Sequence, residues 1–170
     1  MKKTLTILSV VLLAAGGLFA QSTKNLTMTV NLSAWYDLSL GATSISFTDV
    51  APTAAASPAA VSIKSNEGAV TVRAFAVTGI GKTLNLTVKA NGDLTSGSNT
   101  IGIGAISWKA TGTGYVNGAM STSGNITAGS WSGSILHWHE GTFTYSFLRD
   151  YTTQAPGDYT ASATYTLSAV

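Results

Sequence analysis

The stretch Leu26-Thr27-Met28-Thr29-Val30-Asn31-Leu32 alternates strictly between apolar and polar side chains. Successive side chains of an extended chain point to opposite faces, so its four apolar side chains share one face. This period is typical of a half-buried β-strand. Residues 26–32 are therefore predicted to form the most regular strand of the protein.

Shorter runs with the same period continue to the C-terminus, among them Leu84/Leu86/Val88, Phe143/Tyr145/Phe147 and residues 159–169. No window of ten or more residues has a helical period, and the abundance of Thr, Val, Ile and aromatic residues favours strands. Eight to ten short strands at this spacing predict an all-β fold, specifically an antiparallel immunoglobulin-like two-sheet sandwich.

Turn-forming sequences separate the predicted strands. Asn66-Glu67-Gly68 and Asn91-Gly92 are predicted to reverse the chain, and Pro156-Gly157-Asp158 to introduce the last strand. Residues 51–60 contain two prolines and are expected to form a surface connection. Residues 111–134, rich in Gly, Ser and Thr, are expected to form edge strands or a long loop.

Residues 1–20 have the features of a bacterial signal peptide: Lys2 and Lys3, a short apolar run and a small residue, Ala20, at the expected cleavage point. Residues 21–170 then form a single β-sandwich domain. No later segment is long and apolar enough to span a bilayer. We expect the mature chain to be secreted, either into the periplasm or to the cell surface. It contains no cysteine, so no disulfide is expected.

Charge excludes nucleic acid as a partner. Without Lys2 and Lys3, the nine Lys and Arg residues become seven, which equals the seven Asp and Glu residues. A chain without excess positive charge has no electrostatic means of holding a phosphate backbone. The surface is instead rich in hydroxyl groups, with 25 Thr and 20 Ser in the chain. Such a surface tolerates self-association.

Residues that could carry catalysis are few and scattered. The seven acids lie beside predicted turns and strand ends, and no Gly-x-Ser-x-Gly sequence is present. Residues 76–83 loosely match a phosphate-binding loop, but a strand follows them where that loop needs a helix. We therefore predict that the protein is not an enzyme and uses no cofactor.

His137 and His139 are the only histidines, and on a strand they point to the same face. Two imidazoles at this spacing can bind one metal ion. A stable site needs three or four ligands, and no third one is adjacent, since Glu140 points the other way. The two histidines are candidates for a metal site, and we expect none to form.

Four tryptophans raise the alternative of a carbohydrate- or cell-wall-binding module. An exposed indole ring can stack on a sugar. Trp108 is in phase with Ile106 and is expected in the core. Trp131 and Trp138 lie among Gly, Ser and His residues, so they are the candidates for an exposed ligand platform.

The C-terminal segment 156–170 resembles the last strand of chaperone-usher fimbrial subunits and of the related spore coat U type proteins. In those families a glycine lies about fourteen positions from the end, before strictly alternating residues, and Gly157 occupies that place. Ala169 replaces an aromatic residue of the pattern, and the cysteine pair of such subunits is absent. The resemblance implies an immunoglobulin-like subunit of a surface structure.

The same segment is similar to the closing motif of WxL surface domains, which implies attachment to the cell wall. The positions in register are Tyr159, Thr164, Thr166 and Leu167.

The regular stretch at the predicted N-terminus of the mature chain has two interpretations. Leu26, Met28, Val30 and Leu32 can face the core as the first strand of their own sheet. Alternatively, they can act as a strand donor that fills a gap in a neighbouring sandwich and pairs with its open edge. The second interpretation predicts a non-enzymatic structural or adhesive surface protein that self-assembles.

Overall fold

The computed structural model describes residues 24, 26–51, 59–132 and 136–170. The chain divides into two units, residues 1–31 and residues 32–170. The described residues of the first unit form neither helix nor strand, and Leu32 also lies outside any strand. The predicted signal peptide and most of the predicted connection at 51–60 lie outside the described residues.

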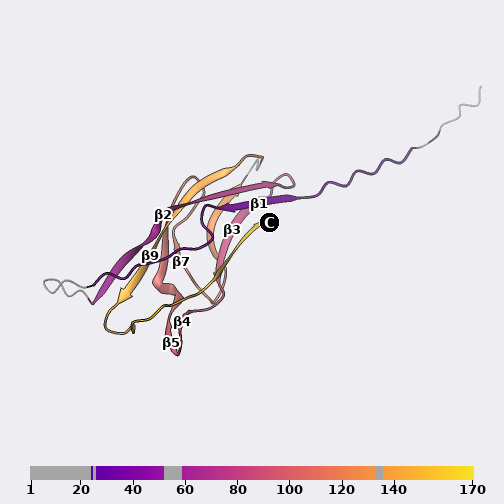
Figure 1. The fold of residues 1–170 in the computed structure, drawn as a ribbon. Coiled ribbons are helices and arrows are strands. Elements are labelled where there is room, and N and C mark those ends of the chain that lie inside the picture. The colour runs from indigo at the N-terminus through magenta and orange to yellow at the C-terminus, as the bar shows by residue number, and fades with distance from the viewer. Residues whose placement is uncertain (1–23, 25, 52–58, 133–135) are drawn as a thin grey trace, which may run out of the picture. The chain divides into compact units, whose positions relative to one another are not determined.

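The second unit is all β, as predicted: a curled five-stranded sheet packs against a three-stranded sheet, and neighbouring strands are antiparallel (Figure 1). The larger sheet has the order β1-β2-β9-β6-β7, with bounds Trp35–Leu40, Ala60–Val77, His139–Asp150, Ile106–Thr111 and Gly118–Ala119. The smaller sheet has the order β10-β3-β8, with bounds Ala163–Ala169, Thr83–Ala90 and Ile126–Ser132.

A short hairpin and a single 3₁₀ turn complete the described elements. The hairpin consists of β4 (Leu94–Ser96) and β5 (Asn99–Ile101), and the turn η1 (Ile103–Ala105) follows it. Among the described residues, no helix has the length and apolar character that crossing a membrane requires.

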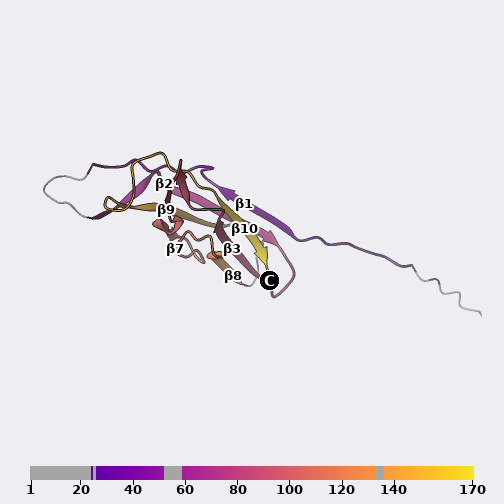
Figure 2. The same ribbon diagram turned by 90° about the horizontal axis from the view of Figure 1, so that it is seen from below.

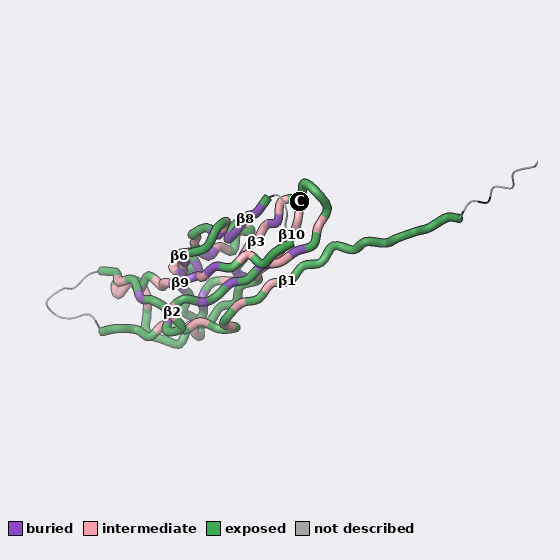
Figure 3. The backbone as a smooth tube through the Cα atoms, turned by 90° about the horizontal axis from the view of Figure 1, so that it is seen from above, coloured by how far each residue is buried: buried purple, intermediate pink, exposed green. Residues whose placement is uncertain are grey.

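The period of two places the core between the sheets. In β3, Leu84, Leu86 and Val88 are buried while the residues between them are only partly covered, and in β9 Phe143 is fully buried. Trp108 is in the core, as predicted. Figure 3 shows buried positions recurring along β2, β3 and β9, in contrast to the exposed and half-buried positions along β1.

The sequence Asn66-Glu67-Gly68 does not reverse the chain, which corrects the prediction. Strand β2 runs on through it, and its register with β9 shifts between Lys64 and Ala69. Gly68 has φ of 68°, which a bulge needs as much as a turn does. The segment after β1 stabilises the bulge, because the Glu67 carboxylate accepts hydrogen bonds from both the backbone N–H and the hydroxyl of Ser46.

The two sheets meet along two sides that differ. On the closed side, residues between β6 and β7 cross to β8: Val116 N–H donates to Ala128 O at 3.0 Å, and Ser130 N–H donates to Gly114 O at 2.8 Å. Strands β7 and β8 are edges, which confirms the edge-strand expectation for residues 111–134.

On the open side, the edge strands β1 and β10 lie side by side (Figure 2). No backbone hydrogen bond joins them in the described part of the chain. Within the described residues, backbone hydrogen bonds therefore join the two sheets along the closed side only.

Candidate functional site

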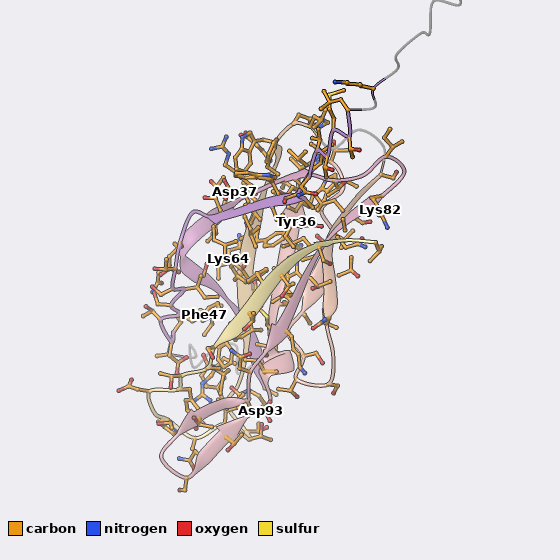
Figure 4. All side chains as sticks on the ribbon, turned by 90° about the vertical axis from the view of Figure 1, so that its right-hand side faces the viewer. Tyr36, Asp37, Phe47, Lys64, Lys82 and Asp93 are labelled. Carbon is orange, nitrogen blue, oxygen red and sulfur yellow. The ribbon has the colours of Figure 1, made fainter. Side chains whose placement is uncertain are left out.

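The open side contains an apolar groove of about 810 Å³. Leu38 and Leu40 of β1, residues 42–47 and Asp49 line it on the side of the larger sheet. Residues 155–163 and Tyr165 of β10 line it on the opposite side. Core side chains form its floor. The apolar residues that line it include Leu38, Leu40, Ile45, Phe47, Ile63 and Ile106. Figure 4 looks towards this side, with Tyr36 and Asp37 marking β1 and Phe47 marking the segment after it.

Side chains of the two edge strands show that the core is incompletely covered here. Leu38 and Leu40 of β1 and Leu167 of β10 pack against the core but are only half-buried, whereas Leu84 and Leu86 of β3 have no exposed surface. An edge strand also presents unpaired backbone N–H and C=O groups along its free side. The groove thus combines uncovered apolar side chains with two backbone edges that can each accept a further strand.

Arg149 and Asp49 bring opposite charges to the groove lining. The Arg149 side chain is 10% exposed, and its Nε lies 3.3 Å from Asp49 Oδ2. Its Nη1 donates to Gln154 O at 2.6 Å, and the guanidinium group lies 5.0 Å from the centre of the Tyr151 ring. Because Arg149 is already paired, this part of the groove is near neutral and suits an uncharged occupant.

Tyr145 and Tyr165 join the two sheets beneath the groove. Their hydroxyl oxygens lie 2.7 Å apart, one on β9 and the other on β10. Burial raises the pKa of both tyrosines, and for Tyr165 the negative charge of an ionised Tyr145 raises it further. On the closed side, burial raises the pKa of Tyr115 to about 12. All three phenols therefore keep their protons at pH values where an unfolded tyrosine has lost its own.

We expect the protein to lose stability above about pH 10. Tyrosines of the unfolded chain ionise near that value, while Tyr115 stays protonated in the fold until about pH 12. The unfolded state then binds fewer protons than the folded state. The free energy of unfolding therefore decreases as pH rises from about 10 to about 12. Urea unfolding across this range measures the loss. The loss of stability with pH should be smaller in Tyr165→Phe than in the parent protein, because this variant lacks one of the buried phenols. An equal loss in the two proteins would contradict the expectation.

The predicted strand donors have the exposure that donation requires. The exposed fractions of Leu26, Met28, Val30 and Leu32 are 79%, 80%, 77% and 90%. None of these residues belongs to a strand, so the described structure does not pair them with either sheet of their own chain. Four apolar side chains on one face of a segment are costly to leave in water.

Trp131 is buried, which corrects the expectation that it is exposed. Its side chain is 6% exposed, its indole N–H donates to Thr113 O at 2.7 Å, and its ring stacks on His139 at 4.7 Å. Trp131 therefore packs on the closed side and offers no surface to a ligand.

His137 and His139 do come together, with ring centres 4.6 Å apart. Burial is the main cause that lowers the pKa of His139, and the nearby His137 lowers it further. The Nε2 atom of His139 has no hydrogen-bond partner. Within the described ranges, no cluster of three or more His, Cys, Asp or Glu residues could hold a metal ion.

Trp138 is partly exposed and belongs to a cluster that the sequence did not indicate. Phe75 of β2 lies 5.3 Å from it between ring centres, and the Arg73 guanidinium group lies 4.8 Å above its ring. Arg73 also forms a 2.8 Å ion pair with Glu140. The period of β2 is the signal that could have found this cluster, because it puts Arg73 and Phe75 on the outer face together.

Comparison of the chain with protein-family models, with curated proteins and with solved structures finds no match. The groove and the exposed N-terminal segment therefore have to be interpreted from their own chemistry.

Proposed function

We propose that this chain is a non-enzymatic structural protein, secreted or held at the cell surface, that self-assembles by strand addition. Residues 26–32 of one copy enter the groove of the next and pair with its free edges. The apolar groove between β1 and β10 is the observation that carries this proposal.

The chemistry of donor and groove is complementary. The donor has apolar side chains at every second position, which is the pattern that a strand laid over an apolar floor requires. Each buried side chain contributes about 1.5–3 kcal/mol, so four of them and the main-chain hydrogen bonds can sustain a long-lived contact. The groove volume of about 810 Å³ is of the size that holds a bound ligand of several side chains.

Acidic residues with structural partners support a non-enzymatic role. Glu140 and Asp49 form ion pairs with arginines, and Glu67 accepts hydrogen bonds from Ser46. The partners of these three carboxylates are thus an arginine side chain or the Ser46 backbone and hydroxyl, which is the setting of structural acids.

Size measurements on the processed chain test the proposal. Gel filtration and electron microscopy should show large assemblies of residues 21–170, whereas a chain without residues 21–32 should be a soluble, folded monomer. Monodisperse monomers of the longer chain would refute self-assembly. An unfolded shorter chain would instead favour the interpretation of residues 26–32 as a strand of their own domain.

A further inference from the structure

The outer face of the five-stranded sheet carries exposed and half-buried aromatic rings that lie outside the core. In β2, Ala74 and Ala76 are fully buried, so Phe75 between them faces outward. Phe75 pairs across the sheet with Asp37 of β1, and its ring contacts Trp138, the residue before β9. Trp35, the first residue of β1, is also outward. We call Trp35, Phe75 and Trp138 the aromatic platform.

The platform is open to solvent. The exposed fractions are 70% for Trp35 and 37% for Trp138, and Val77, which pairs with Trp35, is 36% exposed. Aromatic side chains of this size are among the most costly to leave in water. Single exposed apolar residues are ordinary, but neighbouring ones on one face indicate a binding surface.

Paired charges border the platform. Arg73 and Glu140 lie opposite each other in the β2–β9 ladder and form the 2.8 Å ion pair, so their charges cancel. Their side chains remain 44% and 59% exposed, which leaves hydrogen-bonding capacity on both. Asp37 adds an acceptor beside Phe75. The border therefore offers donors and acceptors with little net charge.

This combination fits a neutral sugar better than the other ligand classes. A pyranose ring has an apolar face of C–H groups that stacks on aromatic rings, and hydroxyls that both donate and accept hydrogen bonds. A nucleic acid or an anionic membrane needs an excess of positive charge, and here Arg73 is matched by Glu140. We propose that the aromatic platform binds a neutral glycan, with a sugar ring against Trp138 and Phe75 and its hydroxyls bonded to Arg73 and Glu140.

This inference does not depend on strand addition. The platform is on the outer face of the larger sheet, while the groove is lined by residues of its inner face and edge. A glycan site of this kind replaces the Trp131 and Trp138 pair expected from the sequence, because Trp131 is buried.

Calorimetric titration of the processed chain with cellohexaose, chitohexaose and maltoheptaose tests the proposal. We expect a measurable affinity for at least one of these neutral oligosaccharides. Trp138→Ala should weaken that affinity at least about tenfold, while Trp138→Phe, which keeps a ring, should retain more of it. Leu148→Ala is the matched control, because Leu148 is a 50% exposed apolar residue near the far end of β9. The affinity of this variant for the oligosaccharide should equal that of the parent chain.

Several results would overturn the proposal. One is the absence of binding to all three oligosaccharides at about 10 mM. Another is equal affinity in Trp138→Ala and the parent chain. A third is a change of oligomeric state in Trp138→Ala without any sugar affinity in the parent, which would assign the platform to a second copy of the chain.

Discussion

Replacing Met28 and Val30 together by aspartate will leave the processed chain monomeric. The proposed contact buries four apolar side chains, and the double variant removes two of them, which forfeits about 3–6 kcal/mol. It also forces two carboxylates against an apolar floor, where an unpaired charge costs several kcal/mol more. Since each 1.4 kcal/mol is a factor of ten, the dissociation constant should rise by more than about a thousandfold.

The control uses the other face of the same segment. Thr27→Asp with Thr29→Asp introduces the same charge, yet these side chains point away from the floor when the four apolar ones point towards it. This variant should still assemble, as judged by gel filtration and electron microscopy. If both double variants became monomeric, added charge alone would explain the loss, and the assignment of the apolar face would be wrong.

A synthetic peptide of residues 24–34 gives a second arm to this test. Added to the monomeric Met28→Asp/Val30→Asp variant at about a hundred times its dissociation constant, it should stabilise the fold by about 2.7 kcal/mol. For a chain of this size that raises the melting temperature by about 5–10 °C. The peptide that carries the two aspartates should leave the melting temperature unchanged. Equal shifts with both peptides would show that the groove does not recognise the apolar face.

Gly114→Ala will lower the stability of the protein by about 3 kcal/mol. Gly114 has φ of 84°, a conformation that costs an L-residue about 1–2 kcal/mol. A Cβ atom there would also collide with the indole of Trp131 and with the carbonyl oxygen of Ser130. Overpacking of this kind costs a further 1–3 kcal/mol or so. Thermal unfolding should therefore shift downward by about 6–12 °C.

Gly124→Ala is the matched control for that substitution. Nothing lies within 4 Å of a Cβ atom built on Gly124, and its φ is not positive. Its stability should stay within about 0.5 kcal/mol of the parent. Equal melting temperatures for Gly114→Ala and Gly124→Ala would contradict the tight packing of Trp131 on the closed side.

The strands that could be predicted are those whose two faces differ in burial. In β3 and β9 the alternation of apolar side chains follows directly from the position of each strand over the core. The bulge in β2 could not be predicted, because Asn-Glu-Gly suits a bulge as well as a turn. The bulge depends on Ser46, which lies about twenty residues away in the sequence. The backbone N–H and the hydroxyl of Ser46 donate hydrogen bonds to the Glu67 carboxylate.

The burial of Trp131 could not be predicted from its glycine-rich surroundings, because such surroundings are also typical of an exposed loop. Because Gly129 and Gly114 have no side chain, the indole ring of Trp131 lies directly against the backbone. A Cβ atom at either position would collide with the ring. Residues 26–32 had the period of a strand, but the period does not say which chain supplies the sheet. The groove could not be predicted at all, since it depends on which strands become edges and which edges meet.

The closed and open sides of the sandwich differ, and this difference determines which donors and acceptors stay free after strand exchange. Residues 26–32 and the groove are different surfaces of one polypeptide, so a contact between them is heterologous and has no twofold axis. Two copies joined in this way leave one donor and one acceptor unused. Unless the rotation between neighbours closes a ring, such a series has two unlike ends, and it stops only when another molecule occupies the last empty groove.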